Sequence, residues 1–148
     1  MTDFDTTVKL TIYEAVAASG RLPDAAGVAR QLDVAEADVR AAFARLRERR
    51  LLVLEPGNPA RIRMAPPFSG VPTLFRVRAG SVDYDANCVW DAYGVAAALR
   101  ADADIDSQDA HTGEPLRLLV RDGRPIPAAA VAHFAVPAAH WWDDIIFT

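Results

Sequence analysis

The segment GVARQLDVAEADVRAAFARLRERRLL, residues 27–52, decides the fold of the first half of the chain. Apolar residues recur in and just before it at helical spacing, which predicts helices over residues 24–32 and 35–49 with a turn at residues 33–34. The buried stripe expected on the second of these helices is Val39, Phe43 and Leu46. Two helices joined by so short a turn are typical of a helix-turn-helix.

The residues on either side of this segment extend the pattern to that of a winged helix. Upstream, apolar residues spaced four apart predict a further helix over residues 6–18. Downstream, two short β-like runs at residues 51–54 and 61–64 flank a Pro-Gly-Asn-Pro turn. Three helices followed by a hairpin is the element order of a winged helix-turn-helix, and we expect this unit to occupy residues 1–66.

The charges of this unit do not favour recognition of DNA. The helix expected over residues 35–49 carries four arginines, but three acidic residues interleave with them. Residues 1–65 hold ten Lys/Arg and nine Asp/Glu, a net charge of +1, and residues 66–148 hold six and eleven, a net charge of −5. A DNA backbone is attracted by a strong positive field, so specific DNA binding is not expected. A non-catalytic winged-helix protein that binds DNA or senses a ligand stays open as the alternative function.

The second half reads as short strands punctuated by proline and glycine. The strand-like runs are residues 74–78, 81–84, 103–107, 116–120, 133–136 and 145–147. One helix, expected over residues 88–100, interrupts them. Strands grouped with a segregated helix indicate an α+β fold. We therefore expect the winged helix to pack on a small mixed or antiparallel sheet with one main helix, formed by residues 67–148.

Composition bounds the cellular setting. The chain has 148 residues, of which 51% are hydrophobic, and a formal net charge of −4. No apolar run approaches the roughly 20 residues that span a bilayer, and the acidic N-terminus does not resemble a signal peptide. Its single cysteine, Cys88, forms no internal disulfide, which suits a reducing compartment. We expect a cytoplasmic protein without a membrane partner; the residues give no indication of its oligomeric state.

Four blocks of the sequence resemble the organomercurial (alkylmercury) lyase family, and they occur in the family's order. The blocks are PFSGVPTLFRVRAG, NCVWDAYGVAAAL, HTGEPLRL and HFAVPAAHWWDDIIFT. Because that family often carries an N-terminal winged-helix-like segment, the resemblance covers nearly the whole chain. It implies protonolysis of a carbon–mercury bond, in which two cysteine thiolates hold the metal and an aspartate helps to deliver the proton to the leaving carbon. Soft thiolate ligands suit a soft metal. The resemblance implies no cofactor; the ligand would be a small organomercurial or another soft-metal or thiol-reactive molecule.

Within these blocks, Cys88 matches the family's first cysteine and Asp91 its aspartate. The resemblance therefore implies that both are catalytic and that Cys88 binds the mercury of the substrate or product. Residues three apart on a helix share a face, so a thiolate and a carboxyl can address one ligand. The helix start favours the Cys88 thiolate, whereas the charge of Asp91 disfavours it, so the pair should share a proton. From the residues alone, a small buried cysteine and an acid of a first helical turn stay open as the alternative.

The resemblance has one departure. In the family a second cysteine follows the Trp-Trp-Asp-Asp block, at about the position after Thr148, and this chain has no cysteine besides Cys88. We expect the chain to lack the family's C-terminal part and to cleave organomercurials slowly or not at all by itself. Different single-cysteine chemistry on the same scaffold is a further alternative.

The other polar and aromatic groups are expected to be structural. The histidines His111, His133 and His140 lack metal-ligand spacing and are expected at the surface or at strand edges. The acids Asp143 and Asp144 are expected in a solvated turn. The aromatic residues expected in the core are Trp90, Tyr93, Trp141 and Trp142.

Overall fold

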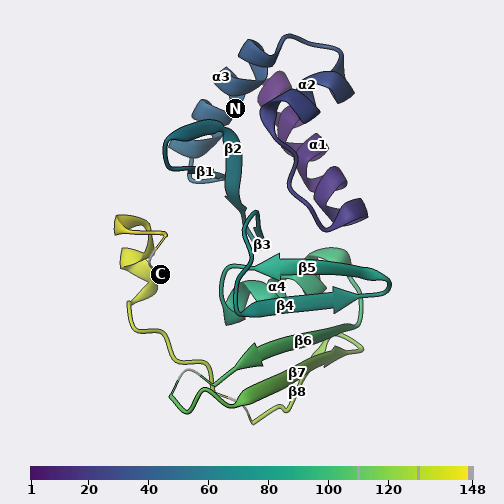
Figure 1. The fold of residues 1–148 in the computed structure, drawn as a ribbon, viewed down its shortest axis with the longest axis vertical. Helices are drawn as coiled ribbons and strands as arrows, with labels where there is room; N and C mark the ends of the chain where they lie inside the picture. Colours follow the sequence, from purple (N-terminus) through teal and green to yellow (C-terminus); the bar gives the residue numbers. More distant parts are fainter. Residues whose placement is uncertain (110, 130, 147–148) are drawn as a thin grey trace.

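The chain folds into helices and an antiparallel sheet, in a computed structural model that describes residues 1–109, 111–129 and 131–146. The helices are α1 (Asp3–Ser19), α2 (Ala25–Leu32), α3 (Glu36–Glu48), α4 (Val89–Leu99) and the 3₁₀ helix η1 (Ala138–Asp143). The strands are β1 (Val53–Glu55), β2 (Asn58–Ala65), β3 (Phe68–Ser69), β4 (Phe75–Ala79), β5 (Val82–Ala86), β6 (Ala103–Gln108), β7 (Pro115–Arg121) and β8 (Arg124–Ile126). Three helices precede the strands and α4 interrupts them, so the predicted α+β class is confirmed (Figure 1).

The N-terminal unit contains three helices and the β1–β2 hairpin, in the predicted order. α1 begins with a capping box between Thr2 and Asp5, and α2 begins where the Asp24 side chain accepts a hydrogen bond from the N–H of Gly27. The predicted apolar stripe of α3 is fully buried against α1, α2 and β2. The core of the N-terminal unit includes Val8, Ile12, Val28, Val39, Phe43, Leu46 and Leu52. The assignment of this unit to the winged-helix class stays a prediction.

Two arginines of α3 are held by carboxylates of the chain itself. Arg45 donates from Nη2 to Asp5 Oδ1 at 2.7 Å, and the Asp5 side chain is only 2% exposed. The Arg45 guanidinium lowers the pKa of Asp5 to about 2. Arg40 forms a second ion pair with Glu36, one turn earlier on the same helix, at 2.6 Å. These pairs neutralise charge that a phosphate backbone would otherwise attract.

The strands form an eight-stranded sheet in the order β1-β2-β3-β5-β4-β6-β7-β8, and each neighbouring pair is antiparallel. The short strand β3 joins the hairpin of the N-terminal unit to the rest, since Ala65 pairs with Phe68 and Phe68 pairs with Ala86. The predicted boundary at residue 66 therefore falls between two paired strands of one sheet. Figure 1 shows β3 in the narrow region between the upper and lower parts of the molecule.

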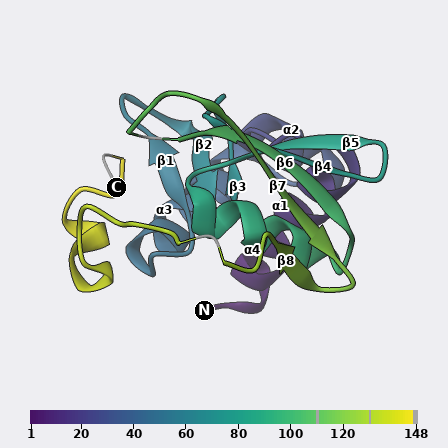
Figure 2. The ribbon, with the colours of Figure 1, turned by 90° about the horizontal axis from the view of Figure 1, so that it is seen from below.

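A second hydrophobic core lies between α4 and the sheet. α4 packs on β4 and β5, and in the view from below it lies along one face of the strands (Figure 2). Its core side chains include Phe68, Val77, Tyr84, Val95, Ile105 and Leu118. α1 also contributes to this core through Val16, and the Tyr84 hydroxyl donates to the carbonyl of Ala17 at 2.7 Å. One helix therefore packs into both cores.

The end of α1 touches strand β5. Gly20 caps the helix in the left-handed region, with φ of 74°, and its N–H donates to the carbonyl of Val16 at 2.8 Å. A Cβ at this position would lie 2.1 Å from the carbonyl oxygen of Asp83. Only glycine fits both the backbone conformation and the contact.

Two predicted strands near the C-terminus are wrong. Residues 133–136 have no strand pairing, and residues 145–146 form a turn, while Phe147 lies outside the described residues. Pro137 precedes η1, and the indole N–H of Trp141 donates to the carbonyl of Val136 at 2.8 Å. This local bonding replaces a strand ladder, and the segment lies to one side of the sheet beside the N-terminal unit (Figure 1). Among the described residues, no helix has the length and hydropathy needed to cross a bilayer.

Candidate active site

Cys88 lies at the junction between β5 and α4. It is the N-cap residue of α4, with an extended backbone, and its carbonyl accepts the hydrogen bond from the N–H of Ala92 at 2.9 Å. The predicted helix start at residue 88 is therefore one residue early. Strand β5 is held in place by its pairing with β3 and β4, and α4 is held in place by the second core. The half-buried Cys88 therefore lies at the junction of two packed elements.

Burial governs the acidity of this thiol. It raises the pKa of Cys88 above its ordinary value, and the negative charge of Asp91 raises the pKa further. The backbone N–H groups of Asp91 and Trp90 act in the opposite direction, as expected for a helix start. Because the net direction is upward, the helix start does not by itself produce a thiolate here. Both the N–H and the carboxylate of Asp91 act on the thiol, so the two predicted residues lie in one neighbourhood.

Asp91 is itself partly buried, and burial raises the pKa of its carboxyl group. Asn87, the residue before Cys88, donates from Nδ2 to Asp91 Oδ2 at 2.9 Å and lowers the pKa in part. A carboxyl group with a raised pKa holds its proton at a higher pH than an exposed aspartate. The direction of this shift is the one that favours an aspartate as a general acid.

The N-terminal unit forms part of the surroundings of Asp91. Burial raises the pKa of Tyr13, on α1, and the charge of Asp91 adds to that increase, which places the phenol near the carboxyl group. The Tyr13 hydroxyl donates to the carbonyl of Pro66 at 2.8 Å. A Cβ on Gly94, one turn after Asp91, would lie 3.0 Å from the Pro67 side chain. α1, the Pro66–Pro67 link and α4 therefore meet on the side of the helix that carries Asp91.

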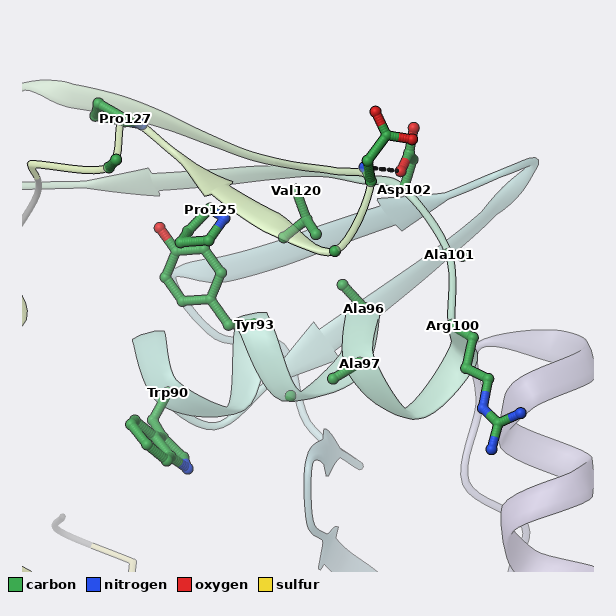
Figure 3. Close-up of a pocket in the computed structure, with 14 residues that line it drawn as sticks. Trp90, Tyr93, Ala96, Ala97, Arg100, Ala101, Asp102, Val120, Pro125 and Pro127 are labelled. Carbon is green, nitrogen blue, oxygen red and sulfur yellow. Dashed lines mark hydrogen bonds between the residues drawn. The ribbon is translucent and has the colours of Figure 1, made fainter.

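A cavity of about 920 Å³ lies on another side of α4, between this helix and the β7–β8 hairpin. Its walls include Trp90, Tyr93, Ala97, Val120, Pro125 and Pro127, and Tyr93 points from the helix toward Pro125 (Figure 3). Neither Cys88 nor Asp91 lines it. Residues two apart on a helix point about 200° away from each other, so Tyr93 and Asp91 face different surroundings. The cavity therefore lies beside the predicted site on the same helix, and its walls include neither of the two predicted residues.

Other residues singled out in the sequence lie elsewhere. Within the described ranges, no group of three or more His, Cys, Asp or Glu side chains is placed to hold a metal ion. His111 and His133 are exposed, and His140 Nδ1 lies 3.0 Å from Asp143 Oδ2. The expectation that Trp90 is a core residue is wrong, because the residue is 66% exposed. Trp142 lies outside both cores, with the guanidinium of Arg50 5.7 Å from its ring centre.

The family is decided by the stretch that contains the sheet and α4. A family model, MerB: Alkylmercury lyase, matches residues 68–148. The chain belongs to the alkylmercury lyase family. This confirms the resemblance read from the four sequence blocks.

A solved structure entitled "Crystal structure of the mercury-bound form of MerB2" has a similar fold, with a TM-score of 0.59 and 23% sequence identity. The alignment covers 84% of this chain and 66% of that chain, and at this identity the likeness concerns the fold alone. No curated protein sequence matches.

Two neighbours of the site in this alkylmercury lyase family member escaped the sequence reasoning. Asn87 stands next to Cys88 in the quoted block, so its place at the site had a local signal. Tyr13 lies more than seventy positions before Asp91 in the chain, and only its packing against the second core brings the two together. The sequence contains no pattern that pairs them.

Proposed function

We propose that the chain is an organomercurial lyase-like enzyme that acts through Cys88 and Asp91. Its thiolate would bind the mercury of the substrate, and its carboxyl group would supply the proton that releases the hydrocarbon. The observation that carries the proposal is the position of the chain's one cysteine beside a partly buried carboxyl group of raised pKa, inside the region that matches the family. A soft metal prefers thiolate, and a raised carboxyl pKa favours proton donation.

The chemistry divides into two balanced steps. In the first, the Cys88 sulfur displaces an anionic ligand from an organomercurial, forming a sulfur–mercury bond and releasing the thiol proton. Asp91 takes up this proton. In the second step, the electron pair of the carbon–mercury bond accepts this proton from the Asp91 carboxyl group. The carbon–mercury bond breaks, a carbon–hydrogen bond forms and the hydrocarbon leaves. Mercury stays in the +2 state throughout, and no oxidant or reductant is needed.

The raised pKa of Cys88 fits this order of events. Burial keeps the free thiol protonated, so the proton is available when mercury displaces it. Asp91 is the neighbouring acceptor, since its charge already acts on the thiol. The pair thus retains one proton close to the leaving carbon.

A second sulfur is required to hold the mercuric product. The chain contains one cysteine, so a small thiol from solution would supply the second ligand. Without the fixed position that a protein ligand provides, this step is slow at low thiol concentration. We therefore expect turnover to rise with added thiol.

The test measures hydrocarbon released from an arylmercurial, with and without added thiol. Cys88→Ser is expected to abolish release, and Asp91→Asn to lower it by about 10²–10⁴-fold while mercury binding is retained. Asp102→Asn, an exposed acid on the link between α4 and β6, is the matched control and should release hydrocarbon at the parent rate. Release that survives Cys88→Ser would refute the proposed roles.

The cavity favours a second candidate function, the binding of a small apolar ligand without catalysis. Ligand pockets typically measure about 300–1,000 Å³ and are mostly apolar. An environment-sensitive apolar dye should gain fluorescence in the parent protein, and Ala97→Phe, which narrows the cavity, should reduce that gain. An equal gain in both proteins would exclude the cavity as the binding site.

A further inference from the structure

Asn87 makes an incomplete set of hydrogen bonds at the predicted site. Its Nδ2 group donates to Asp91 Oδ2 at 2.9 Å. Its other polar atom, Oδ1, is buried, and no donor among the residues that the structure describes reaches it. Buried carbonyl oxygens without a partner are rare in proteins, because leaving one unpaired costs stability. Such an atom beside a reactive pair calls for a functional explanation.

An amide is matched to a carboxyl group that gains and loses a proton. An ionised carboxylate only accepts hydrogen bonds, whereas a protonated carboxyl group also donates one. Asn87 can donate a hydrogen bond to the ionised carboxylate through Nδ2. After a half-turn of its amide about the Cβ–Cγ bond, it can accept a hydrogen bond from the protonated carboxyl group through Oδ1. A lysine or arginine in this place would hold the ionised form alone.

The other groups around the Asp91 carboxyl do not serve both states. Tyr13, from α1, donates its hydroxyl proton to the carbonyl of Pro66. The Cys88 thiol is close, and it is the group whose proton the proposed reaction moves. Asn87 is the side chain that hydrogen-bonds to the carboxyl group within the part of the chain that the structure describes.

We propose that Asn87 is a positioning residue of the Cys88–Asp91 site: its Nδ2 group donates a hydrogen bond to the ionised Asp91 carboxylate, and its Oδ1 accepts a hydrogen bond from the O–H of the neutral acid. The inference rests on the proposed lyase function and adds a residue to it. Asn87 touches neither mercury nor the leaving carbon in this scheme. It keeps the carboxyl group aimed at the same place before and after proton transfer.

The test compares Asn87→Leu, which keeps the size but removes both polar atoms, with Asn87→Gln, which keeps the amide. Ser107→Ala on β6 is the matched control, because Ser107 Oγ is also buried without a partner and lies on a different element. Loss of a group that orients a reactive ligand commonly costs about 10–100-fold in activity. We expect Asn87→Leu to lower kcat for arylmercurial protonolysis by that factor with little change in KM, Asn87→Gln to restore part of it, and Ser107→Ala to leave it unchanged.

A readout without turnover separates this inference from the proposed function. In ¹³C-aspartate NMR titrations, Asn87→Leu should move the Asp91 pKa upward, because the hydrogen bond to the ionised carboxylate is stronger than the bond to the neutral acid and both are lost, and Ser107→Ala should not. If no variant or parent protein cleaves the arylmercurial but the pKa moves, the lyase proposal fails and the positioning role of Asn87 stands. If the parent cleaves and Asn87→Leu changes neither kcat nor the Asp91 pKa, the inference is overturned. A loss of kcat that Asn87→Gln does not relieve, with an unchanged pKa, would equally overturn it.

Discussion

Replacing Gly20 with alanine should weaken the fold by more than its backbone conformation alone explains. A non-glycine residue in the left-handed region costs about 1–2 kcal/mol. At Gly20 the new Cβ would also lie 2.1 Å from the Asp83 carbonyl oxygen, well inside ordinary contact distance. Because that oxygen belongs to the backbone of strand β5, α1 and the sheet must separate to admit the new Cβ. Overpacking of this kind typically costs a further 1–3 kcal/mol or so.

Gly57 offers a matched control for this experiment. Its φ is 75°, nearly equal to the 74° of Gly20, but a Cβ there would meet nothing within 4 Å. Gly57→Ala should therefore lose only the conformational part, about 1–2 kcal/mol, and Gly20→Ala a total of about 2–5 kcal/mol. Urea unfolding followed by far-ultraviolet circular dichroism measures both, and a chain of this size shifts in Tm by about 2–4 °C per kcal/mol. Equal losses in the two variants would refute the role given to the contact between α1 and β5.

Three further predictions concern charge. The folded pKa of Asp5 is about 2 against an ordinary 3.8, so the stabilising effect of the ionised carboxylate is complete above about pH 4 and is lost as the pH falls toward 2. The free energy of unfolding should therefore fall over this pH range in the parent but not, from this cause, in Asp5→Asn, and identical acid-unfolding profiles of the two proteins would contradict the prediction. Since burial and the Asp91 charge both raise the Cys88 pKa, iodoacetamide should alkylate the parent at pH 7.5 more slowly than Asp91→Asn, and a slower variant would reverse our sign. Fluorescence anisotropy against a randomised DNA duplex pool should select no motif, because Arg40 and Arg45 are held by carboxylates; a defined motif would revive the regulator function.

Long periodic segments made the N-terminal helices and the central strands predictable. The helix expected over residues 35–49 is α3 with a difference of one residue at each end, and the runs at residues 103–107 and 116–120 are β6 and β7. Two and three residues are too few for a periodicity, which is why β3 and β8 escaped detection. The run at residues 133–136 has apolar residues but pairs with no strand, and no local pattern reveals whether a partner exists.

In the candidate site, too, the features that depend on local sequence were predictable and those that depend on tertiary packing were not. The spacing of Cys88 and Asp91 is local, and their common neighbourhood followed from it. The net upward shift of the Cys88 pKa did not follow from the sequence, because the burial of the thiol depends on how α4 packs. The effect of burial on the pKa outweighs that of the helix start. Tyr13 beside Asp91 and the unpaired atom of Asn87 likewise arise from tertiary packing.

The packing of α1 into both cores has a consequence for dissecting the molecule. Val8 and Ile12 belong to one core and Val16 to the other, and Tyr84 donates its hydroxyl to the end of the same helix. A fragment that starts at residue 67 would therefore lose a wall of its own interior as well as the neighbour of Asp91. We expect such a truncation to express as a poorly folded, aggregation-prone chain, and the two halves to melt together in a single calorimetric transition. The helical half is then a permanent part of the scaffold around the mercury chemistry proposed here, and it cannot be exchanged like a detachable module.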